Sequence, residues 1–199
     1  MKIKICGLTR PEDITYANRL KPDYIGFVFA LRRRLVTPDR AAELKKMLSP
    51  GIKAVGVFVD EEPDRIIALL RQGVIDIAQL HGNEEEETVR RIREETGAPV
   101  WKAIQMRSRE SIGPWADSQA DMLVLDNGKG TGSSFDWRFL SDIGRPFFLA
   151  GGICAENIRT AVRDVAPYGI DVSSGVETDG VKDYEKMRTV IRAVRESGG

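Results

Sequence analysis

A lone cysteine ends a short apolar, β-branched stretch near the start of the chain, KIKICG at residues 2–7. A thiolate is a base as well as a nucleophile. Asp126 ends a later stretch of the same kind, and a carboxyl group whose pKa is raised by burial can donate a proton. Cys6 and Asp126 therefore predict one base and one acid on two sides of a small substrate, as an isomerase requires. Spacing alone also allows Cys6 to be a small apolar core residue.

Glycines and hydroxyl groups end two further apolar stretches, LAGGI and DVSSGVE. Gly151 and Gly152 lie in the first, and Ser173, Ser174 and Gly175 lie in the second. Glycine lets backbone N–H groups approach an anion closely, and a short helix after the second stretch would add its positive end. If the two stretches are neighbouring strands, these turns predict a phosphate site. The alternative is that the glycines only permit tight turns.

Three consecutive arginines, residues 32–34, follow the apolar stretch YIGFVF. One guanidinium can clamp a substrate carboxylate through two hydrogen bonds, so we expect at most one of the three to be a ligand, and a solvated patch is the alternative. The single histidine, His81, titrates near neutral pH, yet we expect a hydrogen-bonded wall residue there rather than a catalyst.

Eight apolar, β-branched stretches alternate with segments of helical periodicity. Proline and acidic residues mark helix starts: Thr9, Pro11 and Glu12 predict a capping box, and Thr37 with Pro38 predicts a second start. The expected strands cover residues 2–7, 24–29, 53–59, 76–82, 100–105, 121–126, 147–152 and 169–175. A helix opening with residues 84–87 follows the fourth strand, and the last helix covers roughly 182–197.

Strict alternation of eight strands and helices predicts one compact (β/α)8 TIM-barrel domain over residues 1–199. The fifth helix is expected to be degenerate, because Gly113 and Pro114 interrupt it. An open, doubly wound sheet is the alternative fold. Active sites of barrels lie at the carboxyl ends of the strands, where Cys6 and Asp126 fall. Because Lys4 shares a strand face with Cys6, we expect it to pair with Asp171 on the eighth strand.

Thirty acidic residues balance thirty basic ones, so no overall charge favours nucleic acid or a membrane surface as a partner. No signal sequence or membrane-spanning stretch is apparent, which predicts a cytoplasmic protein. Two distant cysteines and one histidine are too few for a zinc cluster, so we expect no metal. A disulfide between Cys6 and Cys154 is not expected in a reducing compartment. The outer helices leave monomer and homodimer equally open.

Seven segments resemble the phosphoribosylanthranilate isomerase family in that family's order: KICGLT, DYIGFVF, VGVFV, QLHG, LVLDNGKGTGSSFDW, LAGGI with AENI, and DVSSGVE. The resemblance implies a (β/α)8 barrel that converts N-(5-phosphoribosyl)anthranilate to 1-(2-carboxyphenylamino)-1-deoxyribulose 5-phosphate in tryptophan biosynthesis, without a cofactor. It implies Cys6 as the base, Asp126 as the acid and Arg34 as the ligand of the anthranilate carboxylate.

The chain departs from the family at two places. Members commonly carry a serine two residues before the arginine, where this chain has Arg32, and a lysine after GTG, where it has Ser133. The glycine-rich stretch around Ser133 predicts either a loop that closes over the site or an ordinary connection. Two alternatives for the function stay open: a related phosphosugar isomerase of the histidine pathway, against which Cys6 argues, and a non-catalytic barrel that only binds a phosphorylated ligand.

Overall fold

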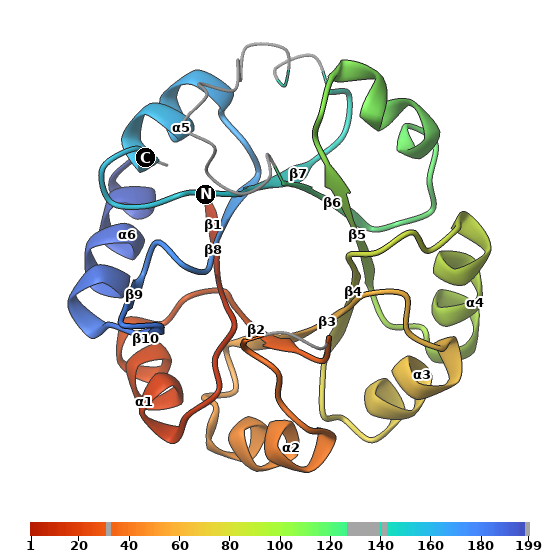
Figure 1. Cartoon of the computed structure of the whole chain (residues 1–199), viewed down its shortest axis with the longest axis horizontal. Coiled ribbons are helices and arrows are strands. Elements are labelled where there is room, and N and C mark those ends of the chain that lie inside the picture. Colours follow the sequence, from red (N-terminus) through yellow and green to blue (C-terminus); the bar gives the residue numbers. More distant parts are fainter. Residues whose placement is uncertain (31–32, 127–139, 141–142, 198–199) are drawn as a thin grey trace.

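Eight parallel strands close into a barrel in chain order, with β8 hydrogen-bonded back to β1 (Figure 1). The computed structural model describes residues 1–30, 33–126, 140 and 143–197. The closed barrel confirms the predicted fold and excludes the open sheet. The strands are β1 (Lys2–Cys6), β2 (Tyr24–Val28), β3 (Lys53–Phe58), β4 (Ile77–Leu80), β5 (Val100–Gln105), β6 (Met122–Asp126), β7 (Phe147–Ala150) and β8 (Gly169–Val172).

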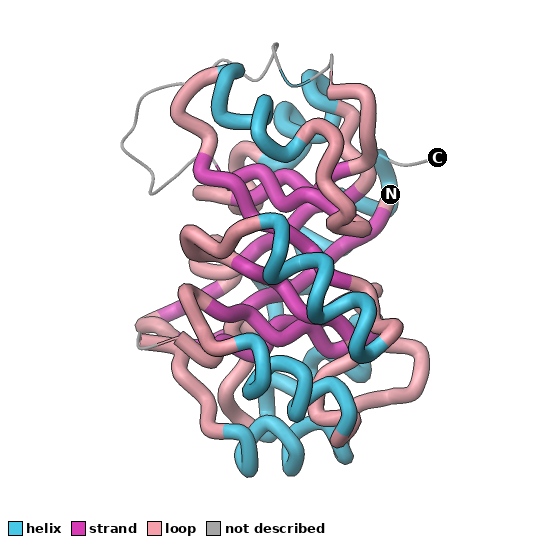
Figure 2. The backbone as a smooth tube through the Cα atoms, turned by 90° about the vertical axis from the view of Figure 1, so that its right-hand side faces the viewer, coloured by secondary structure: helices cyan, strands magenta, loops and turns pink. Residues whose placement is uncertain are grey.

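Helices surround the barrel, and the strands cross the middle of the molecule at a tilt (Figure 2). The connection after β5 contains only a 3-10 helix, as the interruption at Gly113 and Pro114 predicted. The helices are α1 (Pro11–Leu20), α2 (Pro38–Met47), α3 (Pro63–Arg71), α4 (Glu86–Thr96), η1 (Arg109–Trp115), α5 (Ile158–Val165) and α6 (Tyr184–Ser197). The segment after β8 forms the hairpin β9 (Glu177–Thr178) and β10 (Val181–Lys182), so no helix there adds a positive end to the phosphate turns.

Two helix starts differ in how well they were predicted. Thr37 caps α2 as expected, since its side chain accepts a hydrogen bond from the backbone of Arg40. The capping box assigned to Thr9 and Glu12 is wrong, because the N-cap of α1 is Arg10, one residue later than expected. Asp13 supplies the carboxylate there and accepts the backbone N–H groups of Thr9 and Arg10 at 2.9 and 3.0 Å.

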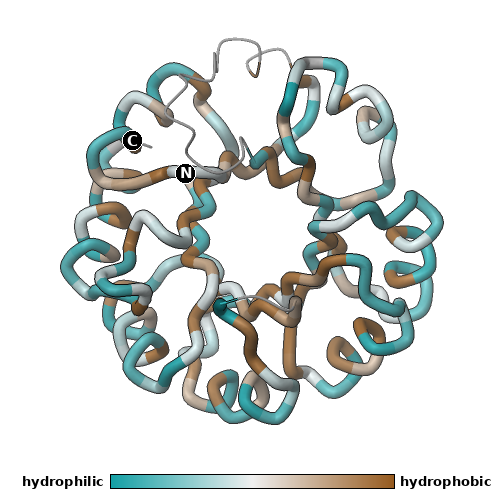
Figure 3. Tube along the Cα trace, in the orientation of Figure 1, coloured by the Kyte–Doolittle hydropathy of each residue, from teal (hydrophilic) through white to brown (hydrophobic). Residues whose placement is uncertain are grey.

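Aromatic side chains fill the barrel near the amino ends of its strands. Trp101 stacks on Phe148 with ring centroids 4.9 Å apart, and Tyr24 meets Trp101 edge-on at 5.0 Å. Such packed layers make the barrel interior a core rather than a pore. Hydrophobic colour follows the strands in Figure 3, whereas the outer helices mix both colours. The aromatic layer closes the amino end of the barrel interior, so a ligand must enter from the carboxyl ends of the strands.

Candidate functional site

Cys6 ends β1 at the carboxyl end of the barrel and is 9% exposed. Lys4, two residues earlier on the same face, places its Nζ 2.6 Å from Oδ2 of Asp171 on the neighbouring β8. This confirms the predicted buried pair. Burial raises the pKa of the Cys6 thiol, and the ammonium groups of Lys4 and Lys182 oppose that rise without cancelling it. The carboxylate of Asp171 adds to the rise, so the net pKa of the thiol stays above its ordinary value, with Lys4 as the main group that favours the thiolate.

Asp126 ends β6 at the same rim, in register with Gln105 of β5 and Ala150 of β7. Its Oδ2 lies 3.4 Å from Nε2 of His81, which follows β4. His81 is thus a wall residue of the opening, as expected, and it contacts the predicted acid. The glycine-rich stretch that follows Asp126, including Ser133, lies outside the described residues, as does Arg32.

The turns after β7 and β8 lie side by side, because Cys154 and Gly175 form a parallel bridge between them. Gly151 and Gly152 have φ of +88° and +63°, a conformation that side chains other than glycine rarely adopt. At Gly175 a Cβ would collide with the carbonyl oxygen of Ile153. Backbone conformation therefore favours glycine in the first turn and close packing of the two turns requires it in the second, and glycine-lined turns of this kind are suited to a phosphate group.

Ser173 and Ser174 belong to the second of these turns, immediately after β8. The hydroxyl of Ser173 donates to the carbonyl oxygen of Cys6 at 3.1 Å, and the backbone oxygen of Ser174 accepts the N–H of Glu177 at 3.1 Å. The predicted anion-binding turn is thus joined directly to the strand end that carries the thiol.

Arg34 lies against the end of β1, since a Cβ added at Gly7 would collide with its Cδ. Gly7 also has φ of +82°, so both the conformation and the space at this position favour glycine. The guanidinium of Arg34 is bound bidentately by Glu177, with Nε–Oε1 and Nη2–Oε2 distances of 2.7 and 2.8 Å. Sequence reasoning did not anticipate that this arginine has a carboxylate partner of its own.

A second buried glutamate was assigned wrongly from the sequence. Glu84 was expected to open the helix after the fourth strand, but α4 begins at Glu86 and Glu84 is buried behind the barrel wall. Its Oε2 lies 2.7 Å from Nζ of Lys102, and its oxygens accept the backbone N–H groups of Asp60 and Gly82. Glu84 is the first of four consecutive glutamates, and residue type alone does not indicate which of the four is buried.

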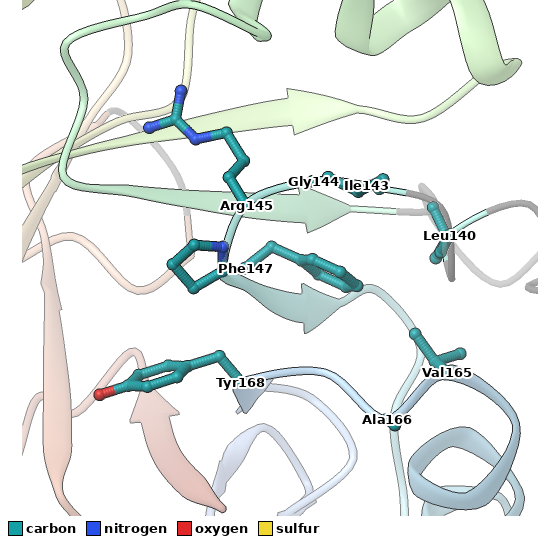
Figure 4. Close-up of a pocket in the computed structure, with 9 residues that line it drawn as sticks. Leu140, Ile143, Gly144, Arg145, Phe147, Val165, Ala166 and Tyr168 are labelled. Carbon is teal, nitrogen blue, oxygen red and sulfur yellow. The ribbon is translucent and has the colours of Figure 1, made fainter.

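A pocket of about 310 Å³ lies at the opposite end of the barrel, near the amino ends of β7 and β8 (Figure 4). Phe147, Val165 and Tyr168 line it, and none of the predicted site residues does. Among the described residues, no helix is long and apolar enough to cross a membrane, and no group of three or more His, Cys, Asp or Glu side chains is arranged to hold a metal ion.

The sequence profile of N-(5'-phosphoribosyl)anthranilate (PRA) isomerase matches residues 3–193. The chain belongs to the phosphoribosylanthranilate isomerase family. A family member from Acetivibrio thermocellus is 43% identical over 211 residues, covering 99% of this chain and 97% of that protein. Another from Clostridium kluyveri is 44% identical over 198 residues, covering 98% of each chain.

Solved phosphoribosylanthranilate isomerase structures have the same fold. The enzyme from Thermotoga maritima superposes with a TM-score of 0.90 at 33% identity, covering 98% of this chain and 99% of that one. A phosphoribosylanthranilate isomerase in complex with reduced 1-(o-carboxyphenylamino)-1-deoxyribulose 5-phosphate has a TM-score of 0.88 at 32% identity, with the same coverage. The family assignment therefore agrees in sequence and in architecture over nearly the whole chain.

Proposed function

We propose that this chain converts N-(5-phosphoribosyl)anthranilate to 1-(2-carboxyphenylamino)-1-deoxyribulose 5-phosphate, with Cys6 as general base and Asp126 as general acid. Membership of the family assigns the isomerase activity and its place in tryptophan biosynthesis. One observation supports the two roles above all: Cys6 and Asp126 each end a strand at the same rim of the barrel, and the two strands β7 and β8 lie between them. Groups placed in this way can act on two positions of one small sugar.

The reaction is a sequence of proton transfers. Asp126 donates its proton to the ring oxygen as the bond from that oxygen to C1 breaks, and the nitrogen lone pair forms a Schiff base with C1. The thiolate of Cys6 then removes the proton from C2, which gives an enolamine. Tautomerisation of the enolamine, with protonation at C1, yields the ketone. The proposal requires neither a redox group nor a metal, so it includes no cofactor.

The ends of the substrate are held at separate places. We assign the phosphate to Gly151, Gly152, Ser173, Ser174 and Gly175, whose two turns are bridged to each other and lined with glycine. We assign the anthranilate carboxylate to Arg34, which lies over Gly7 next to the thiol. The substrate then spans the opening from the β7 and β8 turns to the β2 loop.

The wider setting is part of the same proposal. We propose a single catalytic domain over residues 1–199 that acts in the cytoplasm on a phosphorylated small molecule, without a nucleic-acid or membrane partner. A structural neighbour is described as monomers generated from a dimeric enzyme, so both monomer and homodimer are compatible with the family.

The test is to follow the loss of phosphoribosylanthranilate fluorescence with the purified chain and with Cys6→Ser and Asp126→Asn. We expect each variant to lower kcat at least about 100-fold, because each removes a proton-transfer group. Asp164→Asn is the matched control, since Asp164 is exposed on α5 and pairs with Arg163. Near-wild-type turnover in both site variants would refute the assignment, and binding of the substrate without turnover by the unmodified chain would indicate a binding protein.

A further inference from the structure

The proposed mechanism leaves a buried carboxylate beside the opening without a task. Glu177 lies in the hairpin after β8, and its side chain is 6% exposed. It binds two cations at once: Arg34 through both carboxylate oxygens, and Nζ of Lys182 at 2.7 Å. Burial raises the pKa of Glu177, but these two cations outweigh burial and hold the pKa below its ordinary value. The group is therefore an anion whose position is set by its partners.

Lys182 connects Glu177 to the proposed phosphate turn. Its Nζ donates to the backbone oxygen of Ser173 at 2.9 Å, and the hydroxyl of Ser173 donates to the backbone oxygen of Cys6 at 3.1 Å. Burial lowers the pKa of Lys182, and Glu177 partly offsets that effect. One chain of contacts thus joins the arginine, the anion-binding turn and the strand end that carries the thiol.

The geometry of the Arg34 pair leaves part of the guanidinium available. Glu177 takes the edge formed by Nε and Nη2, and a guanidinium has five N–H donors arranged around three edges. Glu177 is the only acceptor of the Arg34 guanidinium among the residues that the structure describes, so its end-on edge, formed by Nη1 and the second hydrogen of Nη2, can donate to a ligand. The Arg34 side chain is 27% exposed, so Glu177 does not close it off from solvent.

We propose that Glu177 is a positioning residue that makes the site specific for substrates with a carboxylate on the aromatic ring. Glu177 holds the Nε and Nη2 edge of the Arg34 guanidinium, so that the donors on the Nη1 and Nη2 edge are directed to the ligand. This inference rests on the proposed function, which assigns the anthranilate carboxylate to Arg34. A guanidinium already held in place loses less conformational freedom when a ligand binds, and the affinity for the matching anion rises accordingly.

Two probes distinguish this role from a general structural one. The first is reduced 1-(2-carboxyphenylamino)-1-deoxyribulose 5-phosphate, and the second is its phenylamino counterpart, which lacks only the carboxyl group. Their Kd values are measured by calorimetry for the wild type and for Glu177→Gln. We expect the variant to bind the first probe at least about 10-fold more weakly and the second with less than about a 3-fold change, because only the first uses the end-on donors.

The controls separate positioning from folding. Glu84→Gln alters another buried glutamate paired with a lysine, but Glu84 binds backbone groups of the β3 and β4 loops. Both Kd values should therefore rise by the same factor or stay unchanged. Arg34→Lys keeps the charge and loses the fork. In that background Glu177→Gln should change the ratio of the two Kd values by less than about 3-fold, since Glu177 acts through the guanidinium.

Three results would overturn the inference. Equal weakening of both probes by Glu177→Gln would show a structural role, tighter binding of the first probe would show competition with the ligand carboxylate, and no change would show no role. A wild type that binds both probes equally well, with Arg34→Lys also without effect, would instead refute the assignment of Arg34 in the proposed function. If Arg34→Lys removes the preference for the carboxylated probe and Glu177→Gln does not, the assignment of Arg34 stands and only the inference on Glu177 is refuted.

Discussion

Two regions at the carboxyl end of the barrel each bury a glutamate against a lysine, and they use the pair differently. Behind β4 and β5, Glu84 pairs with Lys102, whose Nζ also donates to the backbone oxygen of Gly82 and lies 5.0 Å from the ring centroid of Trp115. Beside β8 and β1, Glu177 pairs with Lys182 and also holds Arg34. The first pair contacts only backbone groups and an aromatic ring, whereas the second also contacts the partly exposed guanidinium of Arg34.

The difference shows that the same two residue types fix either a loop or a side chain. The oxygens of Glu84 bind the N–H groups of Asp60 and Gly82, so the pair holds the β3 and β4 loops together next to His81. Two buried charges cost desolvation free energy in both regions, and each lysine offsets part of it with hydrogen bonds to its glutamate and to one backbone oxygen. Only at Glu177 does the arrangement leave donors for a ligand.

The largest effect is expected where the β4–β5 pair is broken. Lys102→Met leaves the carboxylate of Glu84 buried without its cation, and we expect a loss of about 3–5 kcal/mol in the free energy of unfolding. Adding Glu84→Gln should recover most of it, because the amide oxygen still accepts from the backbone and carries no charge. Urea denaturation measures both. A single-variant loss below about 1 kcal/mol would mean that the pair contributes little to stability.

The β8 pair allows a sharper comparison through pH. The pKa of Glu177 is lowered from 4.5 in the folded chain, so its contribution is complete above that pH and is lost as the pH falls through the lowered pKa. We expect the wild type to exceed Glu177→Gln by about 1.5–3 kcal/mol in unfolding free energy at neutral pH. The gap should close on acidification below 4.5 in a series of urea titrations. A gap that stays constant would show that the charge of Glu177 is not its source.

The smallest effect is expected for an ion pair in solvent. Arg40 and Glu43 on α2 lie 2.9 Å apart with 40% and 65% of their side chains exposed. Arg40→Ala should change the unfolding free energy by no more than about 1 kcal/mol, since water and salt screen the charges. Thermal unfolding under the same conditions as the Lys102 variant measures it. A loss as large as that of Lys102→Met would remove the distinction drawn between buried and solvated pairs.

Much of the architecture was predictable because it depends on local patterns. Alternating apolar stretches and helical segments predicted all eight strands, although several end one to three residues earlier than expected. Thr37 was found as a helix cap because its partner is three residues away. Strand parity alone predicted the pair of Lys4 and Asp171, since residues two apart on a strand share a face and β8 must return to β1 in a closed barrel.

The failures occurred where a side chain chooses among distant partners. Glu84 is one of four consecutive glutamates, and only its burial against Lys102 separates it from its neighbours. The carboxylate that holds Arg34 is 143 positions further along the chain. The hairpin after β8 was not predicted, and it is this hairpin that carries both Glu177 and Lys182.

Local periodicity, the order of the motifs and the residue types at the strand ends were sufficient to predict the barrel, the family and the candidate acid and base. The sequence was sufficient for the candidate acid and base because parallel strands place all their carboxyl ends at one end of the barrel, where active sites of this fold lie. The orientation of Arg34 and the two roles of the buried glutamates were decided by tertiary contacts alone. A charged side chain is fixed by the desolvated partner that it meets, and neighbours in the sequence do not specify that partner.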